Sequence, residues 1–123
     1  MSPVQFDLQR REITGVGVRD LAEKFGTPCY VYETDTIRQR VADLSAFDVI
    51  RYAQKACSNI AILHLMRQLG VLVDSVSGGE IHRAFAAGYA AQGDPPQIVY
   101  TADIFAVKLQ VQVYSLASRH ERL

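Results

Sequence analysis

The sequence predicts an α/β fold built on a parallel sheet, and two observations carry this prediction. Three short, β-prone apolar runs occupy residues 49–54, 71–76 and 97–101. Between them lie two stretches whose apolar residues repeat at helical spacing. Strands that are joined in turn through helices form right-handed crossovers, which place the strands side by side and parallel.

The first part of the chain predicts a helix, a strand and a second helix. Gly26 stands where a C-terminal cap belongs, directly after a helical pattern over residues 18–25. The run CYVYE at 29–33 is β-prone and predicts a strand, with Tyr30 and Tyr32 as packing residues. The apolar positions are Val18, Leu21, Ala22 and Phe25 in the first helix, and Ile37, Val41 and Leu44 in the second.

Two further helices separate the three predicted strands. Ser58 is the expected N-cap of the first of them, which ends at Gly70. The sequence Ser-Gly-Gly-Glu at 77–80 matches the capping box of the other, which ends near Gly88. The apolar faces consist of Ile62, Leu65, Met66 and Leu69 in the first, and of Ile81, Ala84 and Phe85 in the other.

The pattern changes after Phe105. Apolar residues alternate with polar or aromatic ones from Val107 to Val113, which is the period of a strand where a further strand–helix unit would need a helix. We therefore treat residues 106–123 as an atypical tail.

The composition is that of an ordinary globular domain. The 123 residues are 49% hydrophobic and carry 13 basic and 13 acidic side chains, so nothing suggests nucleic acid or an anionic membrane as a partner. No apolar run approaches the ~20 residues that span a bilayer, and the N-terminus lacks the pattern of a secretory signal. Cys29 and Cys57 lie far apart and form no metal-spaced cluster. We expect a reduced, cytoplasmic setting and no metal site.

Lys55 is the strongest candidate for chemistry. It directly follows the strand at 49–54, which puts it at the carboxyl end of a strand in a parallel sheet, where ligands and catalytic groups collect. Ala53 and Ala56 on either side favour partial burial, and desolvation favours the neutral amine that attacks carbonyl groups. The alternative is a solvent-facing lysine at a strand end, which is the common situation for lysine.

Two acids and two histidines are weaker candidates. Asp74 interrupts an apolar strand, where a carboxylate is costly unless it is paired or hydrogen-bonded. It either balances a cationic group or accepts hydrogen bonds from nearby backbone amides. Glu80 is explained by the capping box alone. His64 and His82 fall on predicted helices without a second ligand at metal spacing, so we interpret both as helix-face residues.

Three segments taken together resemble the diaminopimelate decarboxylase family. They are GTPCYVYE at 26–33, RYAQKACSN at 51–59 and VDSVSGGEIHRAFAAGY at 73–89, and the resemblance covers residues 12–105. The wider relatives are the ornithine and arginine decarboxylases of the alanine-racemase-like fold. The resemblance implies the N-terminal portion of a TIM-type (β/α) barrel that binds pyridoxal 5'-phosphate, against which a separate β domain packs.

The resemblance also implies roles for four residues. Lys55 matches the family lysine that holds the cofactor covalently, and Ala53 matches the small residue beside the cofactor ring. Asp74 and Glu80 match two acids that lie close to the cofactor, which gives Glu80 a second role beside the cap. The implied reaction is decarboxylation of meso-diaminopimelate to lysine, with a small-molecule amino acid as substrate and a homodimer as the common assembly of the relatives.

The resemblance divides the chain into three parts. Residues 1–33 form an N-terminal helix and strand segment, residues 34–105 form the first βα units of the barrel, and residues 106–123 form the tail. A whole barrel takes roughly 250 residues, and several parts of the family site have no match here: the histidine on the ring, the phosphate loop, the acid at the pyridine nitrogen and the β domain. We expect a fragment or a shifted reading frame at about Ala106, and negligible turnover from this chain alone.

Two alternatives stay open. One is another member of the same fold, such as an ornithine or arginine decarboxylase or an alanine-racemase-like protein, because the substrate-selecting residues have no match here. The other is a non-catalytic α/β binding module, in which Lys55 is only a surface lysine.

Overall fold

The computed structural model describes residues 10–101, which form two compact units, one up to Arg40 and one from Val41 on. The predicted tail at 106–123 lies outside the described residues.

The N-terminal unit begins with a small antiparallel hairpin that the sequence did not lead us to expect. Its strands are β1 (Glu12–Ile13) and β2 (Val16–Gly17). The turn between them places Thr14 at φ 48° and Gly15 at φ 78°. Two successive residues with positive φ are typical of the tight turns that join antiparallel strands.

Both predicted helices of the first part of the chain are confirmed. Helix α1 (Val18–Phe25) ends at Gly26, whose φ is 78° and whose N–H donates to the carbonyl of Ala22 at 2.9 Å. Glycine adopts this left-handed conformation without steric cost, which is why it ends the helix. Helix α2 (Thr34–Ala42) follows after a connecting segment.

The prediction of a strand over residues 29–33 is wrong. These residues are irregular, and Tyr30, Val31 and Tyr32 are all exposed, so neither tyrosine packs as a strand residue would. A β-prone run becomes a strand only where a neighbouring strand supplies ladder partners. Within residues 10–101 no strand pairs with this run.

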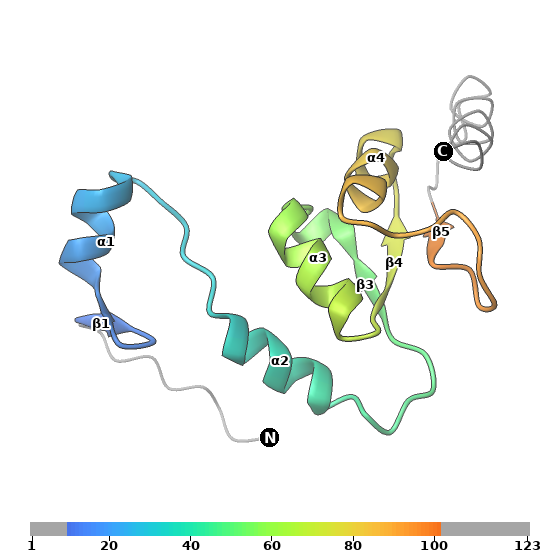
Figure 1. Ribbon diagram of the computed structural model, residues 1–123, viewed down its shortest axis with the longest axis horizontal. Helices are drawn as coiled ribbons and strands as arrows, with labels where there is room; N and C mark the ends of the chain where they lie inside the picture. Colours follow the sequence, from blue (N-terminus) through green and yellow to red (C-terminus); the bar gives the residue numbers. More distant parts are fainter. Residues whose placement is uncertain (1–9, 102–123) are drawn as a thin grey trace. The chain divides into compact units, whose positions relative to one another are not determined.

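The second unit contains a three-stranded parallel sheet of order β3–β4–β5, as predicted. Its strands are β3 (Arg51–Ala53), β4 (Leu72–Ser75) and β5 (Ile98–Tyr100). The helices α3 (Ile60–Gln68) and α4 (Gly78–Ala86) connect the strands in turn and lie beside the sheet (Figure 1). A short 3₁₀ turn, η1 (Gln54–Ala56), follows β3 directly.

One face of the sheet carries the hydrophobic core. Leu63 of α3 and Ala84 of α4 pack with Val73 of β4, and Tyr52 and Ile98 from the outer strands complete this layer. Side chains alternate between the faces of a strand. Ala53, Asp74 and Val99, which pair with one another in the ladder, therefore point to the opposite face.

Of the two predicted N-caps in the second unit, one is confirmed. The N-cap of α3 is Asn59, whose side-chain oxygen accepts a hydrogen bond from the N–H of Ala61 at 2.9 Å, so the prediction of Ser58 is wrong by one residue. The helix starts one residue later than expected, and the amide oxygen of Asn59 then lies at the position that caps it. Ser77 is the N-cap of α4, as predicted.

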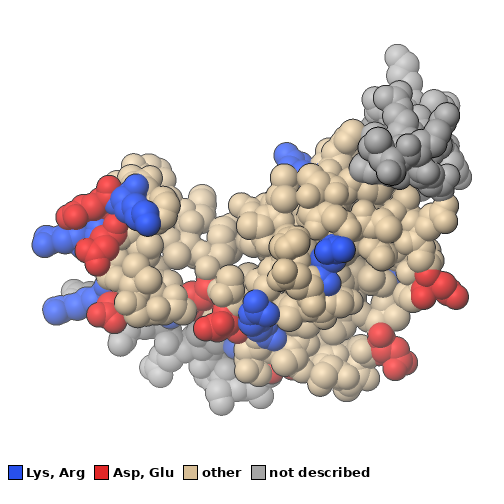
Figure 2. Space-filling view, viewed as in Figure 1, with Lys and Arg blue, Asp and Glu red and all other residues tan. Residues whose placement is uncertain are grey.

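No helix among residues 10–101 has the length and apolar character that crossing a membrane requires. On the face shown in Figure 2, basic and acidic side chains are interspersed, in keeping with a formal net charge of +0.

Candidate functional site

Three strand ends meet at one edge of the parallel sheet and bring the candidate residues into one region. Lys55 lies in η1, directly after β3. Asp74 lies in β4, one residue from its end, and Thr101 follows the last residue of β5. The carboxyl ends of parallel strands share one edge, where the binding sites of α/β proteins form.

The side chain of Lys55 is exposed, and the expectation of partial burial is wrong for the residues described. Gln54, the first residue of η1, takes the buried position on the side of the core, and Lys55, the next residue, is on the other side and exposed. Within residues 10–101 no ion pair involves Lys55, and its amine is accessible to a reactant from solvent.

Asp74 is half-buried and hydrogen-bonded. The Thr101 hydroxyl donates to Asp74 Oδ1 at 2.5 Å. This bond supplies the partner that a carboxylate inside an apolar strand requires, although the donor is a hydroxyl rather than the cation or backbone amide that we considered. Asp74 pairs with Ala53 in the ladder, so the carboxylate and the small methyl group are neighbours on one face.

Glu80 is held by the turn between β4 and α4. Its backbone N–H donates to Ser77 Oγ at 3.2 Å, which confirms the first half of the predicted capping box. Its Oε2 accepts from the N–H of Val76 at 2.8 Å, one residue before the cap that a standard capping box would use. The side chain is 8% exposed. Its carboxylate is therefore fixed near the end of β4.

The structure adds a pair that the sequence analysis missed. Gln54 Nε2 donates to Ser75 Oγ at 2.6 Å, and both residues are 0% exposed. Gln54 Oε1 is buried and has no hydrogen-bond partner among the residues that the structure describes. The available signal was a polar residue that closes the apolar run VIRYAQ immediately before Lys55.

A second hydrogen bond holds the C-terminal side of η1, the lysine turn. The Tyr52 hydroxyl donates to the carbonyl of Cys57 at 2.9 Å. Burial raises the pKa of the Tyr52 hydroxyl above its ordinary value, so it remains a neutral donor at physiological pH. Residues on both sides of Lys55 are thus tied to the sheet by side chains of β3 and η1.

The remaining candidates do not converge on this edge. His64 lies on α3, with Nδ1 3.3 Å from the carbonyl of Ala87 and Nε2 3.1 Å from Gln68 Nε2. His82 is exposed on α4. Among residues 10–101 no group of histidine, cysteine and acidic side chains could hold a metal ion. Within the same range no hydrogen bond or ion pair joins Lys55 to Asp74 or Glu80.

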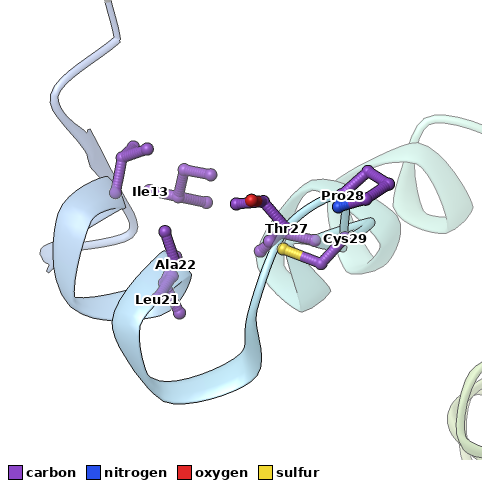
Figure 3. Close-up of a pocket in the computed structure, with 8 residues that line it drawn as sticks. Ile13, Leu21, Ala22, Thr27, Pro28 and Cys29 are labelled. Carbon is purple, nitrogen blue, oxygen red and sulfur yellow. The ribbon is translucent and has the colours of Figure 1, made fainter.

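The N-terminal unit has a pocket of about 400 Å³ with a mostly apolar lining. Ile13 and Ala22 project toward Thr27 and Cys29 across it (Figure 3). The other lining residues are Val18, Leu21, Pro28 and Val31. The lining has no acidic or basic side chain, so the pocket does not supply the groups that acid–base or imine chemistry needs.

Comparison with known proteins gives a consistent result. Residues 34–112 match the family described as "Pyridoxal-dependent decarboxylase, pyridoxal binding domain". The diaminopimelate decarboxylase of Escherichia coli is 55% identical over 93 residues, which are 76% of this chain and 22% of that protein. The diaminopimelate decarboxylase of Streptomyces coelicolor is 59% identical over 83 residues, which are 68% of this chain and 19% of that protein.

Solved structures give the same result. A crystal structure of diaminopimelate decarboxylase superimposes with a TM-score of 0.73 at 54% identity, covering 78% of this chain and 23% of that one. The enzyme from M. jannaschii, solved in complex with L-lysine, superimposes with a TM-score of 0.70 at 29% identity, covering 85% of this chain and 26% of that one. The chain spans about a fifth of the length of the two curated relatives.

Proposed function

The chain belongs to the pyridoxal-dependent decarboxylase family, and we propose from this premise that it carries the lysine-bearing part of a diaminopimelate decarboxylase. The predicted fold class is confirmed, since the α/β unit corresponds to the N-terminal portion of the TIM-type barrel of these enzymes. The observation that carries the proposal is the position of Lys55. Its amine is exposed at the carboxyl edge of the parallel sheet, inside the segment that matches the family.

The family's cofactor is pyridoxal 5'-phosphate, and the residues at this edge fit it. Lys55 offers the primary amine that an aldehyde requires. Ala53 leaves room beside it because its side chain is a single methyl group. The backbone at Gly78 is open, since a Cβ added there would meet no atom within 4 Å. Asp74 adds a carboxylate that would balance positive charge on a nitrogen of the bound cofactor.

Each of the chain's own residues at this edge would then have a separate role. Lys55 would hold the cofactor at the sheet edge through its Nζ. Asp74, fixed by Thr101, supplies negative charge on the face that Ala53 shares. Glu80 keeps its carboxylate at the β4–α4 turn through Val76. When bound, pyridoxal phosphate supplies the electron sink for the electron pair that CO2 leaves behind.

The proposed substrate is meso-diaminopimelate and the proposed product is L-lysine. The names of the relatives and the L-lysine bound to the M. jannaschii enzyme support this choice. We further propose that the reaction takes place in the cytoplasm and that the whole enzyme works as a homodimer. The 123-residue segment by itself would turn over negligibly, because the matched relatives use several times this length.

A segment exchange tests the proposal. The matched 93 residues of the Escherichia coli enzyme are replaced by the corresponding residues of this chain, and CO2 release is measured with pyridoxal phosphate and meso-diaminopimelate. We expect release by the chimera, none after Lys55→Ala, and undiminished release after Lys24→Ala, the matched control lysine. A folded chimera without activity, or activity that survives Lys55→Ala, would overturn the proposal. Sustained release by the 123-residue chain alone would overturn the claim of negligible turnover.

A further inference from the structure

We propose that Gln54 and Ser75 are positioning residues, whose hydrogen bond fixes the turn that presents the amine of Lys55. The inference rests on the proposed function and deepens it, because it concerns how the lysine is held. Neither residue belongs to the set that the family resemblance assigned to the cofactor.

The hydrogen bond joins two adjacent strand ends at the point where the lysine turn begins. Gln54 is the first residue of η1, and Lys55 is the second. Gln54 Nε2 donates to Ser75 Oγ at 2.6 Å. Ser75 is the last residue of β4, and its own carbonyl accepts from the N–H of Thr101 at 3.0 Å. The anchor of the turn therefore reaches all three strands of the sheet.

Among residues 10–101 no hydrogen bond or ion pair fixes the side chain of Lys55. Its side chain is exposed, and within residues 10–101 it takes part in no ion pair. Its position is therefore set by its backbone. The Gln54–Ser75 bond holds the residue before it, and the Tyr52 hydroxyl holds the carbonyl of Cys57 two residues after it. These two bonds fix the turn from both sides.

Stability alone is a poor explanation for a glutamine at this site. The residue is 0% exposed, and its Oε1 is buried without a hydrogen-bond partner within residues 10–101. A buried acceptor that lacks a donor costs its full desolvation free energy, whereas an apolar side chain of the same shape would avoid this cost. The residue keeps one strong bond, to Ser75, at the expense of one unsatisfied atom. This arrangement is explained if the bond between Gln54 and Ser75 serves to orient the turn that carries Lys55.

The test uses selective labelling of the three lysines in the full 123-residue chain, Lys24, Lys55 and Lys108. In the labelling reaction a lysine nitrogen bonds to the aldehyde carbon of pyridoxal phosphate and water leaves. Borohydride then delivers hydride to that carbon, and the nitrogen takes a proton from solvent. Peptide mass spectrometry gives the ratio of label on Lys55 to label on Lys24. In the wild-type chain we expect Lys55 to be labelled about tenfold faster than Lys24.

Four variants separate positioning from stability. Gln54→Met keeps the size and removes the bond, and Ser75→Ala removes it from the other side. Each should lower the labelling ratio about tenfold, to that of an ordinary surface lysine. The double variant Gln54→Met/Ser75→Ala leaves no polar group unpaired at the site, so its melting temperature should recover toward wild type while the ratio stays low. Ser75→Thr retains the hydroxyl and should restore the ratio.

The outcomes distinguish this inference from the proposed function. Wild-type chain that labels Lys55 no faster than Lys24 and Lys108 would overturn the proposed function, and the positioning role with it. Preferential labelling that persists in folded Gln54→Met and Ser75→Ala variants would overturn the positioning role alone. Recovery of both the ratio and the melting temperature in the double variant would also overturn it, since the pair would then act only through stability.

Discussion

The carboxylate of Glu80 accepts a hydrogen bond from the N–H of Val76 at 2.8 Å, and its side chain is 8% exposed. The acid that the family resemblance places near the cofactor is thus held by the turn that joins β4 to α4. A structural role and a role toward the cofactor are compatible, because the hydrogen bond from Val76 already orients the carboxylate.

Removing this carboxylate should lower stability more than neutralising it. We expect Glu80→Ala to reduce the free energy of unfolding by about 1–3 kcal/mol, because the partly buried N–H of Val76 loses its acceptor. Glu80→Gln keeps an acceptor oxygen and should cost less than half as much. Urea unfolding of the three proteins measures both values. Equal losses in the two variants would mean that the charge, rather than the hydrogen bond to Val76, stabilises the turn.

The N-cap of α3 gives a matched pair of neighbours. Asn59 accepts from the N–H of Ala61 at 2.9 Å, and no side-chain cap comes from Ser58. Asn59→Ala should reduce the free energy of unfolding by about 0.5–2 kcal/mol. Ser58→Ala, the control, should change it by less than about 0.5 kcal/mol. If thermal or urea unfolding showed a larger loss of stability for Ser58→Ala than for Asn59→Ala, Ser58 would be the N-cap.

The same comparison illustrates what the sequence could predict. Local patterns sufficed where the structure is set locally, as at Gly26 and at the Ser77 cap. Either Ser58 or Asn59 can cap a helix by its chemistry, and only the first helical hydrogen bonds decide between them. The parallel sheet was also predictable, because helical patterns separate its strands.

Features that depend on distant partners were not predictable. The run at 29–33 has the composition of a strand, but no neighbour among residues 10–101 pairs with it. The Gln54–Ser75 bond spans 21 positions in the sequence, and it forms only because β3 and β4 are adjacent. The burial of Gln54 and the exposure of Lys55 beside it also depend on how β3 packs against the rest of the unit.

The core of the second unit depends on Leu63, which the predicted apolar face of α3 omitted. Leu63 is 0% exposed and packs with Val73, Ala84 and Tyr89. Leu63→Ala should reduce the free energy of unfolding by about 2–5 kcal/mol, because it removes buried surface and leaves a cavity. Ile60→Ala is the control on the same helix, since Ile60 is 46% exposed. A loss of similar size at both positions in urea unfolding would contradict the assignment of Leu63 to the core.

The buried hydroxyl of Tyr89 should make stability fall at alkaline pH. It donates to the carbonyl of Val71 at 2.8 Å, and burial raises its pKa to about 12 from the ordinary value of 10.0. Between pH 10 and pH 12 the unfolded chain loses this proton while the folded chain keeps it. The stabilisation is therefore complete below pH 10 and is lost as the pH rises toward 12.

Replacement by phenylalanine isolates this effect. Tyr89→Phe should cost about 1 kcal/mol at pH 8, because the carbonyl of Val71 loses its donor. Between pH 8 and pH 11 its stability should fall less than that of the wild type by about 1 kcal/mol, because the pKa of Tyr89 is higher in the folded chain than in the unfolded one. Tyr52, whose pKa burial also raises, is present in both proteins and cancels in the difference. Urea unfolding at the two pH values gives the comparison, and parallel declines would show that Tyr89 ionises as readily in the folded chain as in the unfolded one.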